Sequence, residues 1–293
     1  MRLLTRFAGI ALSLCALGAS QSPGDVPGPL EHLVLMHVTG TILIEPDGHV
    51  GDIKFTSTFD PAVRTSLEAK MRDWKFAPIR VGGVARRAET AFEVRLAAKK
   101  VGDGYVVRMD GTNFDAVAKD AVVPDGVPVP ITPRRMAAPS YPEELMMSGK
   151  TGRIRLVILV APDGHVQDVV AAQSLAFDFK GREPESSARK TIRVFEHNAI
   201  IAARRWTFNV PPGNAARGPE AMTVSTDVEY VIKYDTGVAG QWVPVQRAPS
   251  RNIDWLSRDR AEAAVSGGGS AGTVAGLESP YRLVTPVNGK VVM

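Results

Sequence analysis

The sequence predicts an α+β protein of two tandem units, each a small antiparallel sheet of strand–turn–strand–helix–strand order backed by one helix. Three repeated features lead to this prediction. The turn segment Pro46–Asp52 (PDGHVGD) returns as Pro162–Asp168 (PDGHVQD), and the two copies differ only at the sixth residue. An apolar run precedes each turn, and a helix-like stretch ending in Trp-x-Phe follows each one. Three matches in the same order indicate one supersecondary unit that is present twice.

The Pro-Asp-Gly sequences predict two β-hairpins. Proline fixes φ at the first turn position, aspartate caps locally, and glycine accepts the left-handed conformation. Aligning the turns matches alternating residues of the two apolar runs, so one sheet face is shared by both copies. These residues are Val38, Gly40, Ile42 and Ile44 in the first run, and Ile154, Leu156, Ile158 and Val160 in the second.

An amphipathic helix and a closing strand follow each hairpin. We expect Asp60 to cap the first helix, with Pro61 at its first position, and Ser187 to cap the second. The helical spacing of apolar residues predicts a stripe that packs on the sheet. The stripes consist of Val63, Leu67, Met71 and Trp74, and of Ile192, Phe195, Ala199, Ala202 and Trp206. Closing strands are predicted at Thr90–Leu96 and Thr223–Tyr234.

The chain is expected to divide into six segments. Residues 1–20 have a basic start, a short apolar core and small residues near Gly18, which is typical of a signal peptide. We therefore expect a periplasmic location, with inner-membrane anchoring by an uncleaved leader as the alternative. A flexible lead-in (21–30), a first unit (31–109), a Pro-rich linker (110–133), a second unit (134–235) and a weakly structured tail (236–293) follow. Within the tail, a short helix is expected at Asp259–Val265 and a hairpin about Asn288-Gly289.

Composition and motifs argue against several function classes. The formal net charge of +4 over 293 residues is too small and too evenly spread to indicate nucleic-acid binding. The one cysteine, Cys15, lies in the predicted signal peptide, so no disulfide or thiolate metal site is expected. His49 and His165 occupy matched turn positions but lack a metal-ligand spacing. Because no nucleophile–base pattern or phosphate loop is visible, we expect a non-enzymatic protein with no cofactor and no metal.

The second unit resembles the C-terminal domain of TonB-type energy transducers. The resemblance is carried by Pro139-Ser140-Tyr141-Pro142, a short helix at Glu143–Ser148, the glycines of Gly149-Lys150-Thr151-Gly152, the Asp163-Gly164 hairpin and Trp206-Thr207-Phe208 before Pro211. It covers Pro139–Tyr234. The first unit matches from its hairpin onward but lacks the Tyr-Pro segment, and so resembles a degenerate copy.

The resemblance implies non-catalytic protein binding in the periplasm, and a role in TonB-dependent transport. Such domains engage outer-membrane transporters by β-strand addition, in which a partner's extended segment pairs with the last strand of the sheet. The partner would be an outer-membrane transporter or another envelope protein. The matching residues here are Val224, Thr226, Val228 and Tyr230. We expect Val228→Pro to abolish binding while the fold is kept.

A structural role in the cell envelope is the alternative function. The protein would then bind peptidoglycan or associate with itself through paired sheet edges. Basic side chains would matter more than the edge strand in that case, with Arg204 and Arg205 beside Trp206 as candidate contacts and Arg153 and Arg155 as further ones.

Overall fold

The computed structural model describes residues 26, 28–115, 125, 129–232, 239–267, 272–277 and 281–293. The predicted signal peptide, with Cys15, lies outside the described residues, as does most of the lead-in and much of the linker. No helix in the described part of the chain is both long and apolar enough to cross a membrane.

The order strand–strand–helix–strand occurs twice along the chain, with different additional elements in each unit. The N-terminal unit contains β1 (Glu31–Ile44), β2 (Val50–Phe55), α1 (Pro61–Arg72), β3 (Arg80–Val81), β4 (Val84–Ala85), β5 (Ala88–Val101) and β6 (Gly104–Asp115). The C-terminal unit contains β7 (Thr132–Arg135), α2 (Glu143–Met147), β8 (Gly152–Val160), β9 (Val166–Phe177), α3 (Glu185–Ala203), β10 (Thr207–Asn209), two 3-10 turns (Asn214–Arg217 and Pro219–Met222) and β11 (Thr223–Tyr230). The tail contributes β12 (Val243–Arg247), α4 (Arg258–Ser266) and β13 (Ala275–Gly276).

Both units belong to one antiparallel sheet of nine strands. Its order is β13-β11-β8-β9-β12-β1-β5-β6, with β2 also paired to β1. Strand β12 joins the halves, because it pairs with β1 on one side and β9 on the other. The expectation of a weakly structured tail is therefore corrected: part of the tail is the strand that connects the two units.

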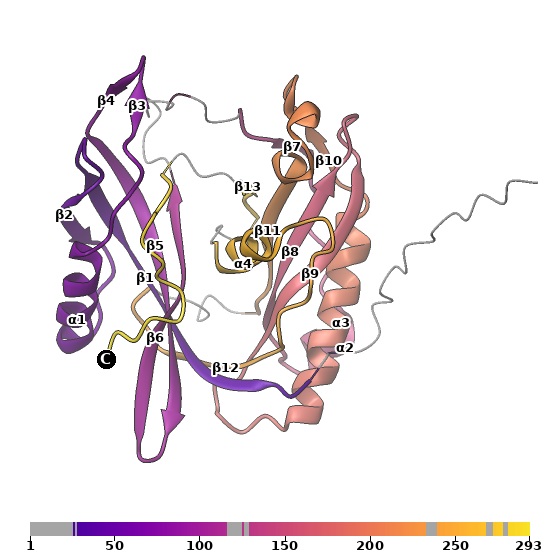
Figure 1. Cartoon of the computed structure of the whole chain (residues 1–293). Coiled ribbons are helices and arrows are strands. Elements are labelled where there is room, and N and C mark those ends of the chain that lie inside the picture. Colours follow the sequence, from indigo (N-terminus) through magenta and orange to yellow (C-terminus); the bar gives the residue numbers. More distant parts are fainter. Residues whose placement is uncertain are drawn as a thin grey trace, which may run out of the picture.

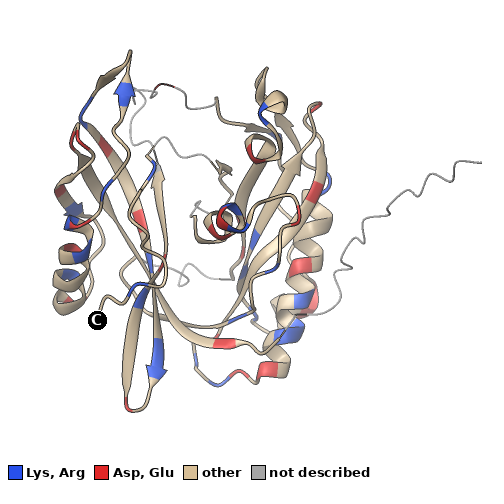
Figure 2. Cartoon of the chain, in the orientation of Figure 1, with Lys and Arg blue, Asp and Glu red and all other residues tan. Residues whose placement is uncertain are grey.

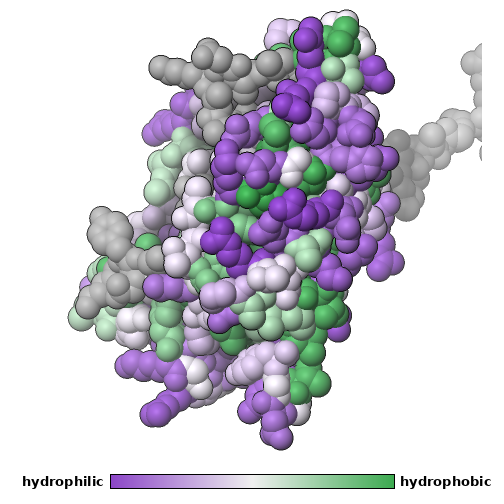
Figure 3. All heavy atoms as spheres, turned by 90° about the vertical axis from the view of Figure 1, so that its left-hand side faces the viewer, coloured by the Kyte–Doolittle hydropathy of each residue, from purple (hydrophilic) through white to green (hydrophobic). Residues whose placement is uncertain are grey.

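The halves of the sheet lie opposite each other with their helices on the outside (Figure 1). Helix α1 covers the outer face of the N-terminal unit and α3 that of the C-terminal unit, while α4 lies between the units. Acidic and basic residues are interspersed over these helices (Figure 2), and hydrophilic and apolar residues are mixed on the face that carries α1 (Figure 3).

The two repeated turns have the same geometry. Gly48 and Gly164 have φ of +86° and +88°, and each N–H donates to the carbonyl oxygen three residues earlier at 2.8 Å. Each glycine carbonyl accepts from the backbone N–H of the phenylalanine in Trp-x-Phe, Phe76 or Phe208, at 2.8 Å. A Cβ on either glycine would lie about 2 Å from that phenylalanine's carbonyl oxygen (2.0 and 2.2 Å). The Trp-x-Phe segment therefore packs directly against the turn glycine and is hydrogen-bonded to it, which explains why the two segments repeat together.

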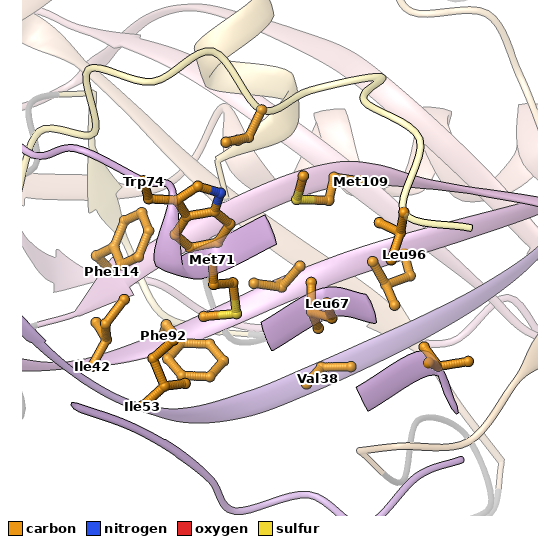
Figure 4. Packing of buried hydrophobic residues seen from close by; sticks show 14 of the residues in the cluster. Val38, Ile42, Ile53, Leu67, Met71, Trp74, Phe92, Leu96, Met109 and Phe114 are labelled. Carbon is orange, nitrogen blue, oxygen red and sulfur yellow. The ribbon is translucent and has the colours of Figure 1, made fainter. Parts of the chain in front are cut away.

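The predicted apolar stripes form the two cores. In the N-terminal unit, the Asp60 carboxylate accepts from Ala62 N and Val63 N at 2.8 and 3.1 Å, as predicted for a cap. The whole first stripe, Val63, Leu67, Met71 and Trp74, is buried and packs on the sheet with Phe92 and Phe114 (Figure 4).

The second helix departs from prediction at its start. Helix α3 begins at Glu185 with Pro184 at the cap position, so the prediction of Ser187 as the cap is wrong. Its stripe is otherwise buried, apart from Ala202, which is half-buried. Trp206 is buried at the helix end and its Nε1 donates to Ala137 O at 2.8 Å.

A candidate partner-binding edge at strand β11

Strand β11 lies next to the end of the sheet. It pairs with β8 over its full length, from Thr223 with Leu159 to Tyr230 with Gly152. On its other side, β13 pairs only with Val224 and Ser225. Beyond these pairs, Gly272 N donates to Asp227 O at 3.1 Å. The outer edge of β11 is thus covered in part by the chain's own tail.

The four residues predicted for the edge direct their side chains into the core. Val224, Thr226, Val228 and Tyr230 are each at most 7% exposed. The ring of Tyr230 stacks on Phe195 with centroids 4.0 Å apart, and its hydroxyl donates to Asn198 Oδ1 at 2.6 Å. Burial raises the pKa of Tyr230. These side chains hold the strand in place, so a partner would meet β11 through the backbone.

The backbone groups at the outer edge belong to the alternate residues. Asp227 O faces the tail, and backbone groups of successive residues in a strand point to opposite sides. Ser225, Asp227 and Glu229 therefore face outward, whereas Val228 faces its partner Ile154 in β8. Proline at 228 would damage the sheet itself, so the expectation that Val228→Pro spares the fold is corrected. Glu229 is the position at which proline removes an outward N–H.

The equivalent edge in the N-terminal unit carries a full strand. Val38 pairs with Val94, and the matched Ile154 pairs with Val228, so β5 and β11 occupy the same place in register. Strand β6 pairs with β5 from Ala91 with Asp115 to Val101 with Gly104. The linker predicted from residue 110 therefore begins later than expected, because β6 continues to Asp115. In one unit this edge binds a long strand, and in the other the described residues that pair with it are those of β13 and Gly272.

A group of buried and half-buried charges lies beside β11, and we name it the inner charge cluster. It lies on the sheet faces that turn away from α1 and α3. Its members are His37, Glu93, Arg95, Asp110, Arg153, Arg155, Asp227 and Glu229. Arg155 and Asp227 are 3% and 4% exposed, and the carboxylate accepts two hydrogen bonds at 2.8 and 2.6 Å. Sequence reasoning missed this cluster, because arginines that alternate with apolar residues are typical of a solvent-exposed face.

The cluster connects the two units. Arg153 pairs with Glu229 at 2.6 Å and donates to His37 Nε2 at 3.1 Å, while His37 Nδ1 lies 2.7 Å from Glu93 Oε1. Burial would raise the pKa of Glu93, but the hydrogen bond from His37 and the nearby charges of Arg95 and Arg153 outweigh it and lower that pKa. Arg95 donates to the carbonyls of Val265 and Ser266, which fixes the end of α4.

The basic residues of the alternative function fall into two groups. Arg153 and Arg155 belong to the inner charge cluster and are not a surface patch, which corrects that part of the expectation. Arg204 and Arg205 are exposed at the end of α3. Arg205 lines a groove of about 510 Å³ together with Arg135, Asn198 and Trp206.

The matched turn histidines are exposed. His49 and His165 each lie beside the turn aspartate of their own cassette, Asp47 or Asp163, at 2.9 and 3.2 Å. Within the described residues, no group of three or more potential ligands is placed to hold a metal ion.

Comparison of the chain with protein-family models, with curated proteins and with solved structures gives no match. The resemblance to TonB-type domains thus depends on the residues of the second unit.

Proposed function

We propose that the protein is an exported, non-catalytic binding protein of the periplasm whose C-terminal unit is a TonB-like domain and whose N-terminal unit is a degenerate copy of it. The C-terminal unit would dock an envelope protein, with an outer-membrane transporter as the expected partner, by β-strand addition at the outer edge of β11. A role in TonB-dependent transport follows from that partner.

This proposal rests on one observation: β5 and β11 are equivalent strands, but their outer edges are paired over very different lengths. Strand β6 pairs with β5 through eleven residue pairs, whereas β13 pairs with the matched strand β11 through two. An edge whose N–H and C=O groups are only partly paired is a template for another strand. The side chains of β11 are packed in the core, so the strand is held rigidly for backbone pairing.

Cell-wall binding has weaker support. Of its four candidate arginines, the half-buried Arg153 and the buried Arg155 are held in ion pairs, which leaves Arg204 and Arg205. Self-association through sheet edges has to displace the tail at β11, and also at β6, where Val107 N donates to Met293 O at 2.9 Å. We therefore favour strand addition by a separate protein.

Proline at the outward position tests the proposal. Synthetic peptides that copy extended periplasmic segments of outer-membrane transporters would be titrated into the whole protein by calorimetry. Glu229→Pro and Glu229→Ala both remove the ion pair with Arg153, but only the proline removes the outward N–H. We expect at least one peptide to bind the wild type, and Glu229→Pro to bind it about tenfold more weakly than Glu229→Ala.

Two outcomes would contradict the proposal. One is equal affinity of the proline and alanine variants for the peptide, and the other is the absence of binding to any transporter peptide. Circular dichroism of both variants checks that the fold is retained.

A further inference from the structure

The tail residue Val274 lies where the N-terminal unit has Phe114. In the N-terminal unit Phe114 is paired with Phe92. The matched position on β11 is Thr226, because Ile42 pairs with Thr90 and the equivalent Ile158 pairs with Val224. The printed ladder of β13 consists of Val224 with Gly276 and Ser225 with Ala275, and extending its register by one residue sets Val274 opposite Thr226. The two residues thus hold the same position on equivalent edges.

Their surroundings are also equivalent, but Val274 fits less completely. Phe114 is 6% exposed, and its ring meets Trp74 and Phe76 edge-on, with centroids 6.1 and 5.0 Å apart. Val274 packs against the matched core, which contains Trp206 and Phe208, but is only half-buried. A larger aromatic side chain at this position would bury more apolar surface.

A second mismatch lies across the strand pair. Thr226 takes the place of Phe92 and is 2% exposed, and its hydroxyl has no hydrogen-bond partner within the described part of the chain. A buried polar group without a partner is destabilising. With the tail in place, Val274 therefore fills its apolar site incompletely, and the Thr226 hydroxyl lacks a hydrogen-bond partner within the described residues.

The tail segment Gly272–Leu277 pairs with β11 over a short stretch of the described chain. The ladder has two residue pairs, Gly272 N adds a bond to Asp227 O, and Val274 and Leu277 pack beside the neighbouring apolar clusters. A partner that forms a longer ladder would gain more hydrogen bonds than the tail loses.

We propose that the partner strand runs antiparallel to β11, displaces Gly272–Leu277, and places an aromatic side chain opposite Thr226. This inference rests on the proposed function and specifies its partner: an extended segment with a phenylalanine-like residue at one fixed position. The tail is then an internal competitor for the same edge.

A peptide that copies β6 provides the probe. The peptide Gly104–Asp115 and a version with alanine in place of Phe114 would be titrated into the whole protein. Ala275→Pro removes the N–H that faces Ser225, whereas Gly276→Pro is the matched control, because residue 276 pairs with Val224, whose backbone groups face β8. Val274→Ser weakens the packing of the tail but keeps the backbone hydrogen bonds of β13. It is the second test of the competition if Ala275→Pro is poorly folded.

We expect the Ala275→Pro and Val274→Ser proteins to bind the β6 peptide about tenfold more tightly than the wild type and Gly276→Pro do. The alanine peptide should bind all four proteins about tenfold more weakly than the β6 peptide. Equal affinity for both peptides would overturn the aromatic preference, and unchanged or absent binding in both tail variants would overturn the competition.

The two proposals can fail separately. Loss of the proline effect at Glu229 with transporter peptides, while the β6 peptide still shows its aromatic preference, would overturn the proposed function alone. A proline effect at Glu229 with transporter peptides, together with equal binding of the β6 peptide and its alanine version, would overturn the inference about the aromatic position alone.

Discussion

Arg155 and Asp227 face each other across β8 and β11, and the guanidinium donates to both carboxylate oxygens at 2.8 and 2.6 Å in a site that is almost fully buried. Removing one partner leaves an uncompensated buried charge, so Asp227→Ala should lower the free energy of unfolding by about 3–5 kcal/mol. The double variant Arg155→Met with Asp227→Leu should cost less than this single change. Urea unfolding of the three proteins measures both values. A single variant no less stable than the double one would show that the pair is not electrostatically coupled.

The same pair predicts a dependence of stability on pH. Burial alone would raise the pKa of Asp227, but the charge and hydrogen bonds of Arg155 outweigh it, so the pKa lies below its ordinary value of 3.8. A carboxylate with a lowered folded-state pKa adds stability above its unfolded-state pKa, and that stability is lost as the pH falls through the folded-state value. The stability gap between wild type and Asp227→Asn should be largest near neutral pH and shrink below about pH 4. Urea unfolding between pH 7 and 2 tests this, and a constant gap would contradict it.

The turn glycines predict a paired loss of stability. Gly48→Ala and Gly164→Ala each place a Cβ close to a phenylalanine carbonyl at a positive φ. The left-handed conformation alone costs about 1–2 kcal/mol, and the clash adds to it. Gly181→Ala is the control, since it has a φ of +61° but no atom within 4 Å of the added carbon. Thermal unfolding should rank both turn variants well below the control. Equal losses at all three sites would show that the contact with Trp-x-Phe contributes nothing.

The repeated unit could be predicted from sequence because its signals are local. The Pro-Asp-Gly turns, the Asp60 cap and the helical stripes depend on residues a few positions apart. Strand β12 could not be predicted, since it has five residues and contains Pro244. That proline is tolerated because it precedes the ladder to β9, which covers Val245–Arg247; Pro244 pairs with Val34, and its carbonyl, which needs no N–H of its own, accepts from Asp178 N at 2.9 Å.

The occupancy of the edge depends on distant parts of the chain, and so it was not visible in the sequence. Residues 110–113 (Asp-Gly-Thr-Asn) are turn formers, yet they continue β6, where Asp110 forms a bulge opposite Arg95 and Leu96. Gly111 is needed there, because a Cβ would lie 2.2 Å from the carbonyl oxygen of Ser266 in α4. The alternating arginines of β8 likewise face the other unit, which no local pattern reveals.

The two helix-end tryptophans offer a matched test of one hydrogen bond. Trp206 Nε1 donates to Ala137 O, whereas the buried Nε1 of Trp74 has no partner within the described residues. Both Trp→Phe changes remove similar volume from a tightly packed site, but only Trp206→Phe also leaves a carbonyl without its donor. We expect Trp206→Phe to cost about 1–2 kcal/mol more than Trp74→Phe in urea unfolding, because a lost bond between buried groups adds to the packing loss. If Trp74→Phe proves equally or more destabilising, the bond to Ala137 does not contribute to holding the segment before α2 against the end of α3.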